Sequence, residues 1–217
     1  TLEDIAKEMA YYKMNEFHVH LNDNLIFYED YASAEEAREL AYTGFRLESD
    51  VVEGSNDGLN QAYLTNEDLY YTKDEFRSFI LDSRSMGVKI TPEYDTQGHS
   101  GAFTKVRPDL MHQNIVSGAA NRAGEQFDLS YEKYDESLAF VESIWDEYLT
   151  EDMFDQSMTV HIGTDEYYGE KNRFRMFSDD LIEYVQSKGY TVRLWGSLSS
   201  MPGEADVRSE GVQMNVW

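Results

Sequence analysis

The chain contains no cysteine among its 217 residues. That absence excludes disulfides, zinc sites built on thiolates, and catalysis by a thiol nucleophile. No apolar run is long enough to span a bilayer, and no signal peptide is recognisable. No glycine-rich phosphate loop follows any expected strand, which argues against a nucleotide-binding sheet. We therefore look for chemistry that uses carboxylates, imidazoles and aromatic side chains.

Basic residues are also scarce, with 18 Lys and Arg against 42 Asp and Glu, for a formal net charge of −24. Nucleic acids and anionic membranes are bound by basic patches, so we expect neither as a partner. A neutral ligand such as a sugar fits this charge better than a polyanion. Most of the acids are expected to coat a solvated surface. The length and the 41% hydrophobic content predict one globular domain over residues 1–217.

Helix and strand signals alternate along the chain. Five strands are predicted, at residues 17–21, 88–94, 159–162, 190–195 and 211–217. Helices are predicted after Thr1, over residues 34–42, after Thr72, and over residues 134–148 and 173–188. Single strands that alternate with helices pair in parallel, so the fold class is α/β, either a (β/α)-barrel or a doubly wound sheet. The stretch at about 25–72 has little strand character and is predicted to be an insertion.

Asp165 and Glu166 directly follow the apolar strand at 159–162. Two adjacent acids at the carboxyl end of a buried strand are costly unless they are paired, solvated or used in chemistry. The plainer interpretation is a solvated acidic turn. In an ordinary retaining glycosidase, two carboxylates about 5–5.5 Å apart lie on opposite sides of the sugar. Neighbouring residues do not easily do this, but one acid can protonate the leaving oxygen while the other orients a nucleophile that the substrate carries, such as a 2-acetamido group.

Three segments, at residues 13–24, 90–100 and 161–166, together with Leu194-Trp195 and Val216-Trp217, resemble glycoside hydrolase family 20 in order and spacing. The resemblance spans essentially the whole chain. It implies a (β/α)8 TIM-barrel fold, of which this chain holds strands two to six. The first and seventh barrel strands, with a sugar-binding arginine and a tyrosine, are expected to be missing, so the chain is expected to be an incomplete barrel.

The resemblance also implies the roles of individual residues. Glu166 is expected to be the general acid and then the base, and Asp165 to hold the acetamido nitrogen. Asp23 and His99 match a hydrogen-bond network behind the acid that would tune the acidity of its carboxyl. The implied activity is that of a β-N-acetylhexosaminidase or a lacto-N-biosidase, which needs no cofactor and acts on an oligosaccharide or glycoconjugate, outside or at the surface of a bacterial cell.

Trp195 and Trp217 would wall the sugar pocket of such an enzyme. Two positions depart from the family pattern: Gln97 stands where proline is usual, and Thr164 replaces a frequent glycine. Without the resemblance, His99 is equally well interpreted as a core or turn histidine, and Asp23 as a turn residue. Glu93 and Asp95 are interpreted as partners of loop amides, with Asp95 a further candidate to support the site.

Two other functions remain open on the sequence. His18 and His20 lie on one face of a strand, which would suit a metal-dependent amidohydrolase. Against this, Asp23 would fall on the opposite face from His20 if the strand stayed regular, and His18, His20 and His161 are more readily interpreted as structural. The other alternative is a barrel fragment that binds carbohydrate without turning it over.

Overall fold

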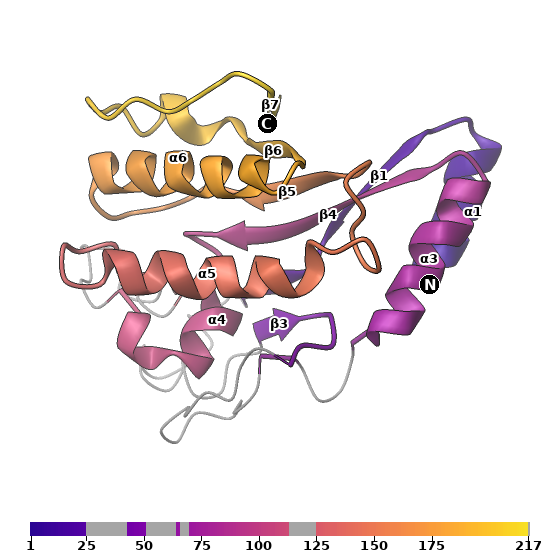
Figure 1. The fold of residues 1–217 in the computed structure, drawn as a ribbon, viewed down its shortest axis with the longest axis horizontal. Helices are drawn as coiled ribbons and strands as arrows, with labels where there is room; N and C mark the ends of the chain where they lie inside the picture. The colour runs from indigo at the N-terminus through magenta and orange to yellow at the C-terminus, as the bar shows by residue number, and fades with distance from the viewer. Residues whose placement is uncertain (25–42, 51–63, 66–69, 113–124, 217) are drawn as a thin grey trace, which may run out of the picture.

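The computed structural model describes residues 1–24, 43–50, 64–65, 70–112 and 125–216 (Figure 1). Its centre is a parallel sheet of five strands in the order β1-β4-β5-β6-β7. These are β1 (Glu16–His20), β4 (Lys89–Thr96), β5 (Thr159–Gly163), β6 (Thr191–Trp195) and β7 (Val212–Asn215). Each predicted strand is confirmed to within two residues of its ends.

Of the main helices, the first two begin directly after the predicted capping residues Thr1 and Thr72. The main helices are α1 (Leu2–Tyr11), α3 (Lys73–Ser85), α5 (Tyr134–Tyr148) and α6 (Lys171–Ser187). Thr1 and Thr72 each form a capping box with the acid three residues later. Helix α6 starts two residues earlier than predicted, because the Glu170 carboxylate accepts hydrogen bonds from the amides of the first turn. The predicted helix at 34–42, and most of the predicted insertion, lie outside the described residues.

The sheet is strongly curved, which decides between the two predicted architectures. In a flat sheet with a strand spacing of about 4.8 Å, β1 and β7 would lie about 19 Å apart. Instead, Asn215 Nδ2 on β7 lies 3.4 Å from His18 Nδ1 on β1. Arg193 on β6 likewise forms an ion pair with Glu16 on β1. Side chains of strands three and four places apart meet across a concave face, as in a TIM-type barrel and unlike an open doubly wound sheet.

The two faces of this sheet differ in chemistry. The concave face carries polar and aromatic side chains, among them His18, Glu93, His161 and Trp195. The convex face carries apolar side chains that are buried, such as Val160, Ile162 and Val192. Helices α5 and α6 lie side by side in front of the sheet in Figure 1 and bury aromatic and aliphatic residues of their own. The helices thus form the outer layer, and the concave face is left to build a site.

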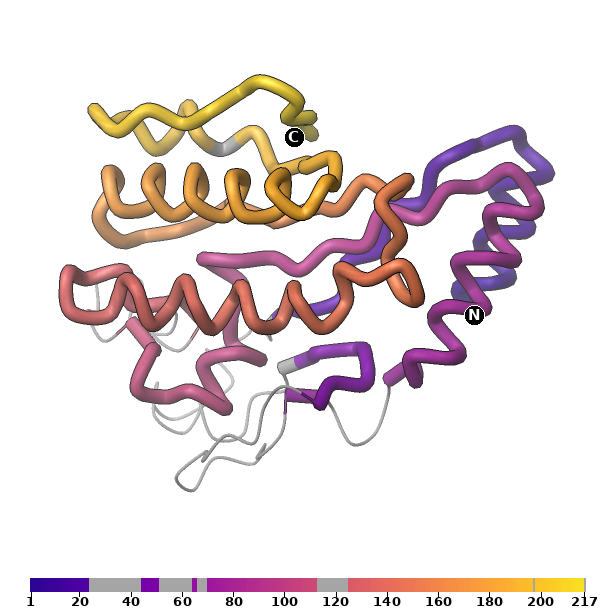
Figure 2. Tube along the Cα trace, viewed as in Figure 1, coloured from indigo at the N-terminus to yellow at the C-terminus, as the bar shows by residue number. Residues whose placement is uncertain are grey.

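Small elements between β1 and α5 were not predicted. A two-stranded antiparallel sheet pairs β2 (Asn22–Asn24) with β3 (Thr43–Phe45), and a short helix α4 (Gly101–Val106) is buried at every residue. The 3-10 turns η2 (Pro108–Leu110) and η4 (Gly196–Ser199) complete the described elements. Figure 2 follows the chain from α1, in indigo, to β7, in yellow.

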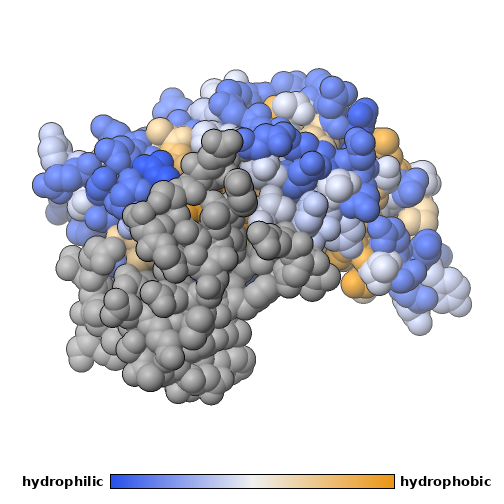
Figure 3. Space-filling view, turned by 90° about the horizontal axis from the view of Figure 1, so that it is seen from below, coloured by the Kyte–Doolittle hydropathy of each residue, from blue (hydrophilic) through white to orange (hydrophobic). Residues whose placement is uncertain are grey.

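The described surface in Figure 3 is largely hydrophilic, with scattered apolar residues, as the strong negative charge leads one to expect. Among the described residues, no helix is both long and apolar enough to cross a membrane.

Candidate active site

The carboxyl ends of neighbouring strands bring the predicted acids and their network together. Asp165 and Glu166 follow β5, His99 follows β4, and Asp23 lies in β2 just beyond the end of β1. Asn22 fastens these ends to one another, since its side-chain amide donates to the carbonyl oxygens of Asp95 and His99 and accepts from the Asp95 N–H. The loop after β4 is therefore held against the start of β2.

His99 lies between the acids and Asp23. Its Nε2 is 3.4 Å from Glu166 Oε2 and 3.8 Å from Asp165 Oδ1, and its Nδ1 is 3.0 Å from Asp23 Oδ1. Burial alone would lower the pKa of His99, but the hydrogen bond to Asp23 and the surrounding carboxylates outweigh it and hold the pKa above its ordinary value. One imidazole thus connects both candidate catalytic acids to the carboxylate behind them.

Glu166 also lines a hollow in the protein surface. The hollow has a volume of about 420 Å³. Its remaining lining residues come from the loop after β5, the start of α6 and the segment after η4: Tyr167, Tyr168, Gly169, Lys171, Ser200 and Met201. The side chain of Glu166 is 42% exposed, whereas that of Asp165 is 15% exposed. Glu166 is thus the more accessible of the two acids.

The backbone around these acids is strained. His99, Thr164 and Glu166 have φ values of 47°, 78° and 46°, in the left-handed region that non-glycine residues rarely adopt. Residues held in this region cost about 1–3 kcal/mol each and concentrate at functional sites. Thr164, which replaces a frequent glycine of the family pattern, thus has a backbone conformation that suits glycine. Gln97, the other departure from the family pattern, is buried and donates to Ser178 Oγ at 2.9 Å on α6.

Asp95 lies beneath the acids and is 1% exposed. Burial raises its pKa well above the ordinary value, and the charges of Asp165 and Glu93 raise it further. The carboxyl of Asp95 therefore holds its proton more tightly than that of an ordinary aspartic acid. Its Oδ1 and that of Asp165 are both buried and without a hydrogen-bond partner among the described residues. The interpretation of Asp95 as a simple partner of loop amides is too narrow, since its carboxyl interacts with Asp165.

Space for the Asp95 carboxyl exists only because residue 163 is glycine. A Cβ at Gly163 would lie 1.9 Å from Asp95 Oδ1 and 2.6 Å from Asp95 Cα, and its φ is +75°. We expect Gly163→Ala to lower the free energy of unfolding by about 2–5 kcal/mol, through backbone strain and overpacking together. Urea unfolding would measure the loss.

Gly87 provides the matched control for that substitution. Its φ is +84°, but an added Cβ would meet no atom within 4 Å. Gly87→Ala is expected to show the strain alone, about 1–2 kcal/mol. Equal losses for the two variants would show that contact with Asp95 does not constrain residue 163.

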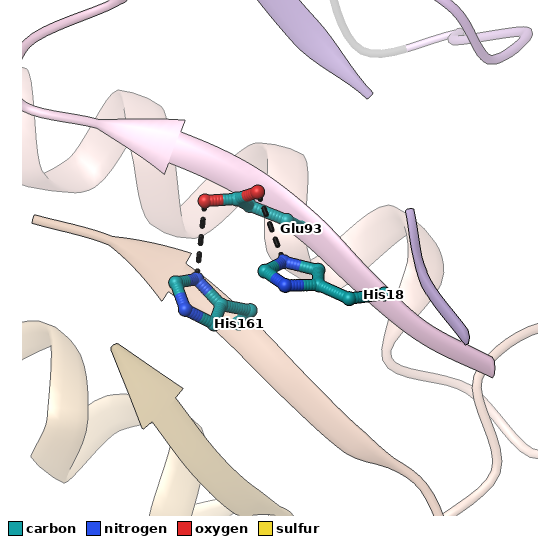
Figure 4. Close-up of side chains that lie close together, drawn as sticks. All are labelled: His18, Glu93 and His161. Carbon is teal, nitrogen blue, oxygen red and sulfur yellow. Dashed lines mark ion pairs between the residues drawn. The ribbon is translucent and has the colours of Figure 1, made fainter. Parts of the chain in front are cut away.

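Glu93, on the concave face of β4, is surrounded by ring nitrogens from three other strands. Its Oε2 lies 2.7 Å from His20 Nδ1. Figure 4 shows the two other contacts, from Oε2 to His18 Nε2 at 2.9 Å and from Oε1 to His161 Nδ1 at 3.2 Å. Trp195 Nε1–H donates to the same Oε1 at 2.6 Å. Burial by itself would raise the pKa of Glu93, but the three imidazoles hold it far below its ordinary value. Glu93 is therefore a buried carboxylate, not a partner of loop amides as the sequence suggested.

Three groups of these side chains have ligand atoms close enough for a metal ion: His18 with Glu93 and His161, His20 with Glu93 and Asp95, and Asp95 with His99 and Asp165. A metal ligand must direct a free lone pair at the ion. Both oxygens of Glu93 accept hydrogen bonds from protein donors, Oε2 from His20 and Oε1 from Trp195. In the two groups that share Glu93, the donor set therefore fits a hydrogen-bonded carboxylate better than a metal centre.

The two predicted tryptophans differ in outcome. Trp195 stands at the end of β6, with its ring centroid 4.8 Å from that of His161 and 5.4 Å from that of His18. Its indole N–H donates to Glu93 Oε1, and this hydrogen bond fixes the orientation of the ring. Trp217 lies outside the described residues. That either ring walls a sugar pocket stays a prediction.

His20 and Glu93 are polar residues next to the site that the sequence did not assign to it. His20 Nε2 lies 2.9 Å from Asp23 Oδ2. The expectation that a regular strand would turn Asp23 away from His20 does not hold, because β1 ends at His20 and the chain enters β2 at Asn22. One signal in the sequence could have shown this cluster. It is the alternating pair His18 and His20 on one strand, with a buried acid, Glu93, in register on the neighbouring strand.

Comparisons with known proteins point to one family. The catalytic domain of glycosyl hydrolase family 20 matches residues 1–175. The chain is 24% identical over 149 residues to a lacto-N-biosidase of Bifidobacterium bifidum, a match that covers 58% of this chain and 13% of that protein. It is 25% identical over 166 residues to a beta-hexosaminidase of Akkermansia muciniphila, covering 76% of this chain and 30% of that protein.

Solved structures agree with the fold. The beta-N-acetylhexosaminidase of Bacteroides fragilis superposes with a TM-score of 0.68 at 18% identity and covers 100% of this chain and 42% of its own. The beta-N-acetylhexosaminidase of Streptomyces coelicolor gives a TM-score of 0.68 at 20% identity, with 100% and 39% covered. The chain thus spans less than half the length of these relatives, and the likeness establishes the TIM-barrel type of fold.

Proposed function

The chain belongs to glycosyl hydrolase family 20, and from that membership we propose that it carries the acid and the stabilising carboxylate of a glycosidase that removes terminal β-linked N-acetylhexosamine residues. The observation that carries the proposal is the placement of Asp165 and Glu166 about a single imidazole, with Glu166 on a surface hollow. Beta-hexosaminidases and a lacto-N-biosidase among the relatives support the choice of substrate class.

The first step breaks the bond between C1 of the sugar and the leaving oxygen. Glu166 gives its proton to that oxygen, while the carbonyl oxygen of the 2-acetamido group forms a bond to C1 from the opposite face. The product of this step is a cyclic oxazolinium ion. Asp165 accepts a hydrogen bond from the acetamido N–H and offsets the positive charge that develops there. Consecutive residues can divide the work in this way because the substrate supplies its own nucleophile.

The second step returns the enzyme to its starting state. Glu166, now a carboxylate, takes a proton from water as the water oxygen attacks C1. The bond from C1 to the acetamido oxygen breaks, so the acetamido group is restored and the sugar leaves with retained configuration. His99 lies next to both acids, so its electrostatic interaction with Glu166 becomes stronger when that carboxyl gives up its proton and weaker when the proton returns.

The size of the released sugar is a separate question. We propose that the −1 site, which holds the sugar whose C1 bond is broken, takes an N-acetylhexosamine. Release of a disaccharide such as lacto-N-biose requires room for a second sugar next to that site. Comparing the hydrolysis of an aryl N-acetylglucosaminide with that of an aryl lacto-N-bioside distinguishes the two activities. Faster turnover of the monosaccharide substrate indicates a hexosaminidase, and turnover of the disaccharide substrate alone indicates a biosidase.

The substrate-assisted route predicts strong inhibition by a thiazoline mimic of the cyclised acetamido group. Transition-state and intermediate analogues bind about 10²–10⁸-fold more tightly than substrates, and the ring nitrogen of the thiazoline would face Asp165. An inhibition constant at least about 100-fold below the KM of the aryl substrate is expected for the full-length protein.

Two outcomes would count against the proposal. Hydrolysis that the thiazoline leaves unaffected would point to a nucleophile on the protein. Tight binding of the thiazoline by a protein that hydrolyses neither aryl substrate would favour the alternative of carbohydrate binding without turnover.

A further inference from the structure

Imidazoles and carboxylates alternate in an unbroken row behind the candidate acid. Glu93 Oε2 is 2.7 Å from His20 Nδ1, and His20 Nε2 is 2.9 Å from Asp23 Oδ2. The other oxygen of Asp23 is 3.0 Å from His99 Nδ1, and His99 Nε2 is 3.4 Å from Glu166 Oε2. The row connects the buried concave face of the sheet with the surface hollow.

The acceptors on either side of His20 determine which of its ring nitrogens carry a proton. An ionised carboxylate only accepts hydrogen bonds, and His20 has one carboxylate at each ring nitrogen. Both nitrogens of His20 must therefore donate, which makes the ring an imidazolium. Burial works against this charge, but the hydrogen bonds with Asp23 and Glu93 and the charges of both raise the pKa of His20 to about 10.

Asp23 couples the charge of His20 electrostatically to His99, because its carboxylate interacts with both rings. Each of its carboxylate oxygens faces a different ring, so the negative charge of one carboxylate is shared between His20 and His99. If His20 were neutral, the charge of Asp23 would act on His99 alone and would favour the protonated form of that ring more strongly.

Glu93 keeps His20 in place from the interior side. Its second oxygen accepts from Trp195, so the same carboxylate fixes both the indole at the end of β6 and the ring of His20. His18 also faces Glu93 Oε2, at 2.9 Å, and among the described contacts it has none with Asp23 like the one that His20 makes. The two histidines of β1 therefore share Glu93 and differ in their connection to the acid.

We propose that His20, held by Glu93, is a positioning residue that sets the protonation of His99 and, through it, the acidity of Glu166. The step from His99 to the acid rests on the proposed function. The electrostatic coupling from His20 to His99 does not. Neither His20 nor Glu93 touches the reacting atoms, so their effect is transmitted through Asp23.

The charged and titratable groups that face this row come from four strands and the loops that follow them. His99 faces Asp23, Asp165 and Glu166, and His20 faces Asp23 and Glu93. Beyond Glu93 lie His18 and His161, and Asp95 is close enough to feel the charges of Asp23, Glu93 and Asp165. Among them, the imidazolium of His20 is bonded directly to the Asp23 carboxylate that orients His99.

The test compares the same substitution at two histidines of one strand. His20→Gln removes the imidazolium next to Asp23, whereas His18→Gln disturbs the other contact to the same Glu93 oxygen. Titration of the ring resonances by NMR is practical, because the chain has 5 histidines. Removing a positive charge raises the pKa of its neighbours, so His20→Gln is expected to raise the pKa of His99 by about one unit. His18→Gln is expected to leave it within about 0.2 units of the original.

The unsubstituted protein supplies a second measurement, which holds even if His20→Gln does not fold. The ring of His20 should keep both N–H protons at pH 8, and titration of His20 near its ordinary value of about 6.5 would overturn the proposal. So would equal shifts of His99 in the two variants, because that result would indicate a structural disturbance through Glu93.

The enzymatic readout is the pH profile of kcat/KM in the full-length protein. In His20→Gln the more basic His99 should keep its positive charge beside Glu166 to higher pH, which favours the carboxylate form of the acid. The limb of the profile that reports loss of the Glu166 proton should therefore move to lower pH, and a profile that stays in place would overturn the step from His99 to Glu166. A protein that hydrolyses no N-acetylhexosaminide would contradict the proposed function, while the NMR titration would still decide the coupling between His20 and His99.

Discussion

Replacing Glu166 with glutamine is expected to lower kcat on a natural N-acetylhexosaminide by about 10²–10⁴-fold, because a positioned general acid contributes that much and an amide has no proton to give. The substitution keeps the shape of the side chain and an oxygen able to face His99 Nε2. It should therefore leave the fold intact. Steady-state kinetics with natural and aryl substrates, together with thermal unfolding, would measure both effects.

The leaving group separates loss of acid catalysis from general damage. An aryl group with a low pKa needs little protonation as it departs, so its hydrolysis should fall much less than that of a natural glycoside. Azide should not restore the rate by replacing a protein nucleophile, since the nucleophile belongs to the substrate. Glu8→Gln, at an exposed residue of α1, is the matched control and should keep full activity. Full activity in Glu166→Gln would remove the assignment of the acid.

Much of the fold could be predicted from local signals. The capping boxes at Thr1 and Thr72 mark helix starts through hydrogen bonds within four residues of chain, so the sequence alone contains them. The apolar run before Asp165 likewise identified β5 and its functional end. These signals act over short distances along the chain, which is why their positions were found to within a residue or two.

The curvature of the sheet and the cluster around Glu93 could not be predicted in the same way. Contacts such as that between His18 and Asn215 join residues 197 positions apart, and only the barrel geometry brings them together. Glu93 appears in the sequence as one acid among 42, and burial at 0% exposure is what gives it a distinct role. The relation of Asp23 to His20 depends on where β1 ends, and no period-2 pattern specifies that point.

Replacing Glu93 with leucine is expected to lower the free energy of unfolding by about 3–5 kcal/mol, the usual loss when one partner of a buried charged group is removed. Leucine fills the space but accepts no hydrogen bond. The N–H groups of Trp195 and His20 would then face an apolar side chain, and the imidazolium of His20 would lose its interior counter-charge. Chemical denaturation at several pH values would measure the loss.

The pH dependence distinguishes lost charge from lost packing. The pKa of Glu93 is depressed, so its contribution is present above its unfolded value of about 4.3 and is lost as pH falls below it. The pKa of His20 is raised to about 10, so its contribution is complete below about 6.5 and is lost as pH rises through 10. The difference between wild type and Glu93→Leu should therefore be largest between about pH 4.3 and 6.5 and decline on both sides.

Glu93→Gln is the control for that interpretation, because it keeps the shape and one acceptor oxygen while removing the charge. Its loss of stability should be smaller than that of the leucine variant, since its carbonyl oxygen can still accept from Trp195. The gap between Glu93→Gln and wild type should narrow as pH falls below about 4.3, because the wild-type carboxyl then takes up a proton in the unfolded chain while it stays ionised in the folded protein. If the stability lost in each variant does not change with pH, packing and not the buried carboxylate holds these strands together, and the charge on His20 then has no interior anchor.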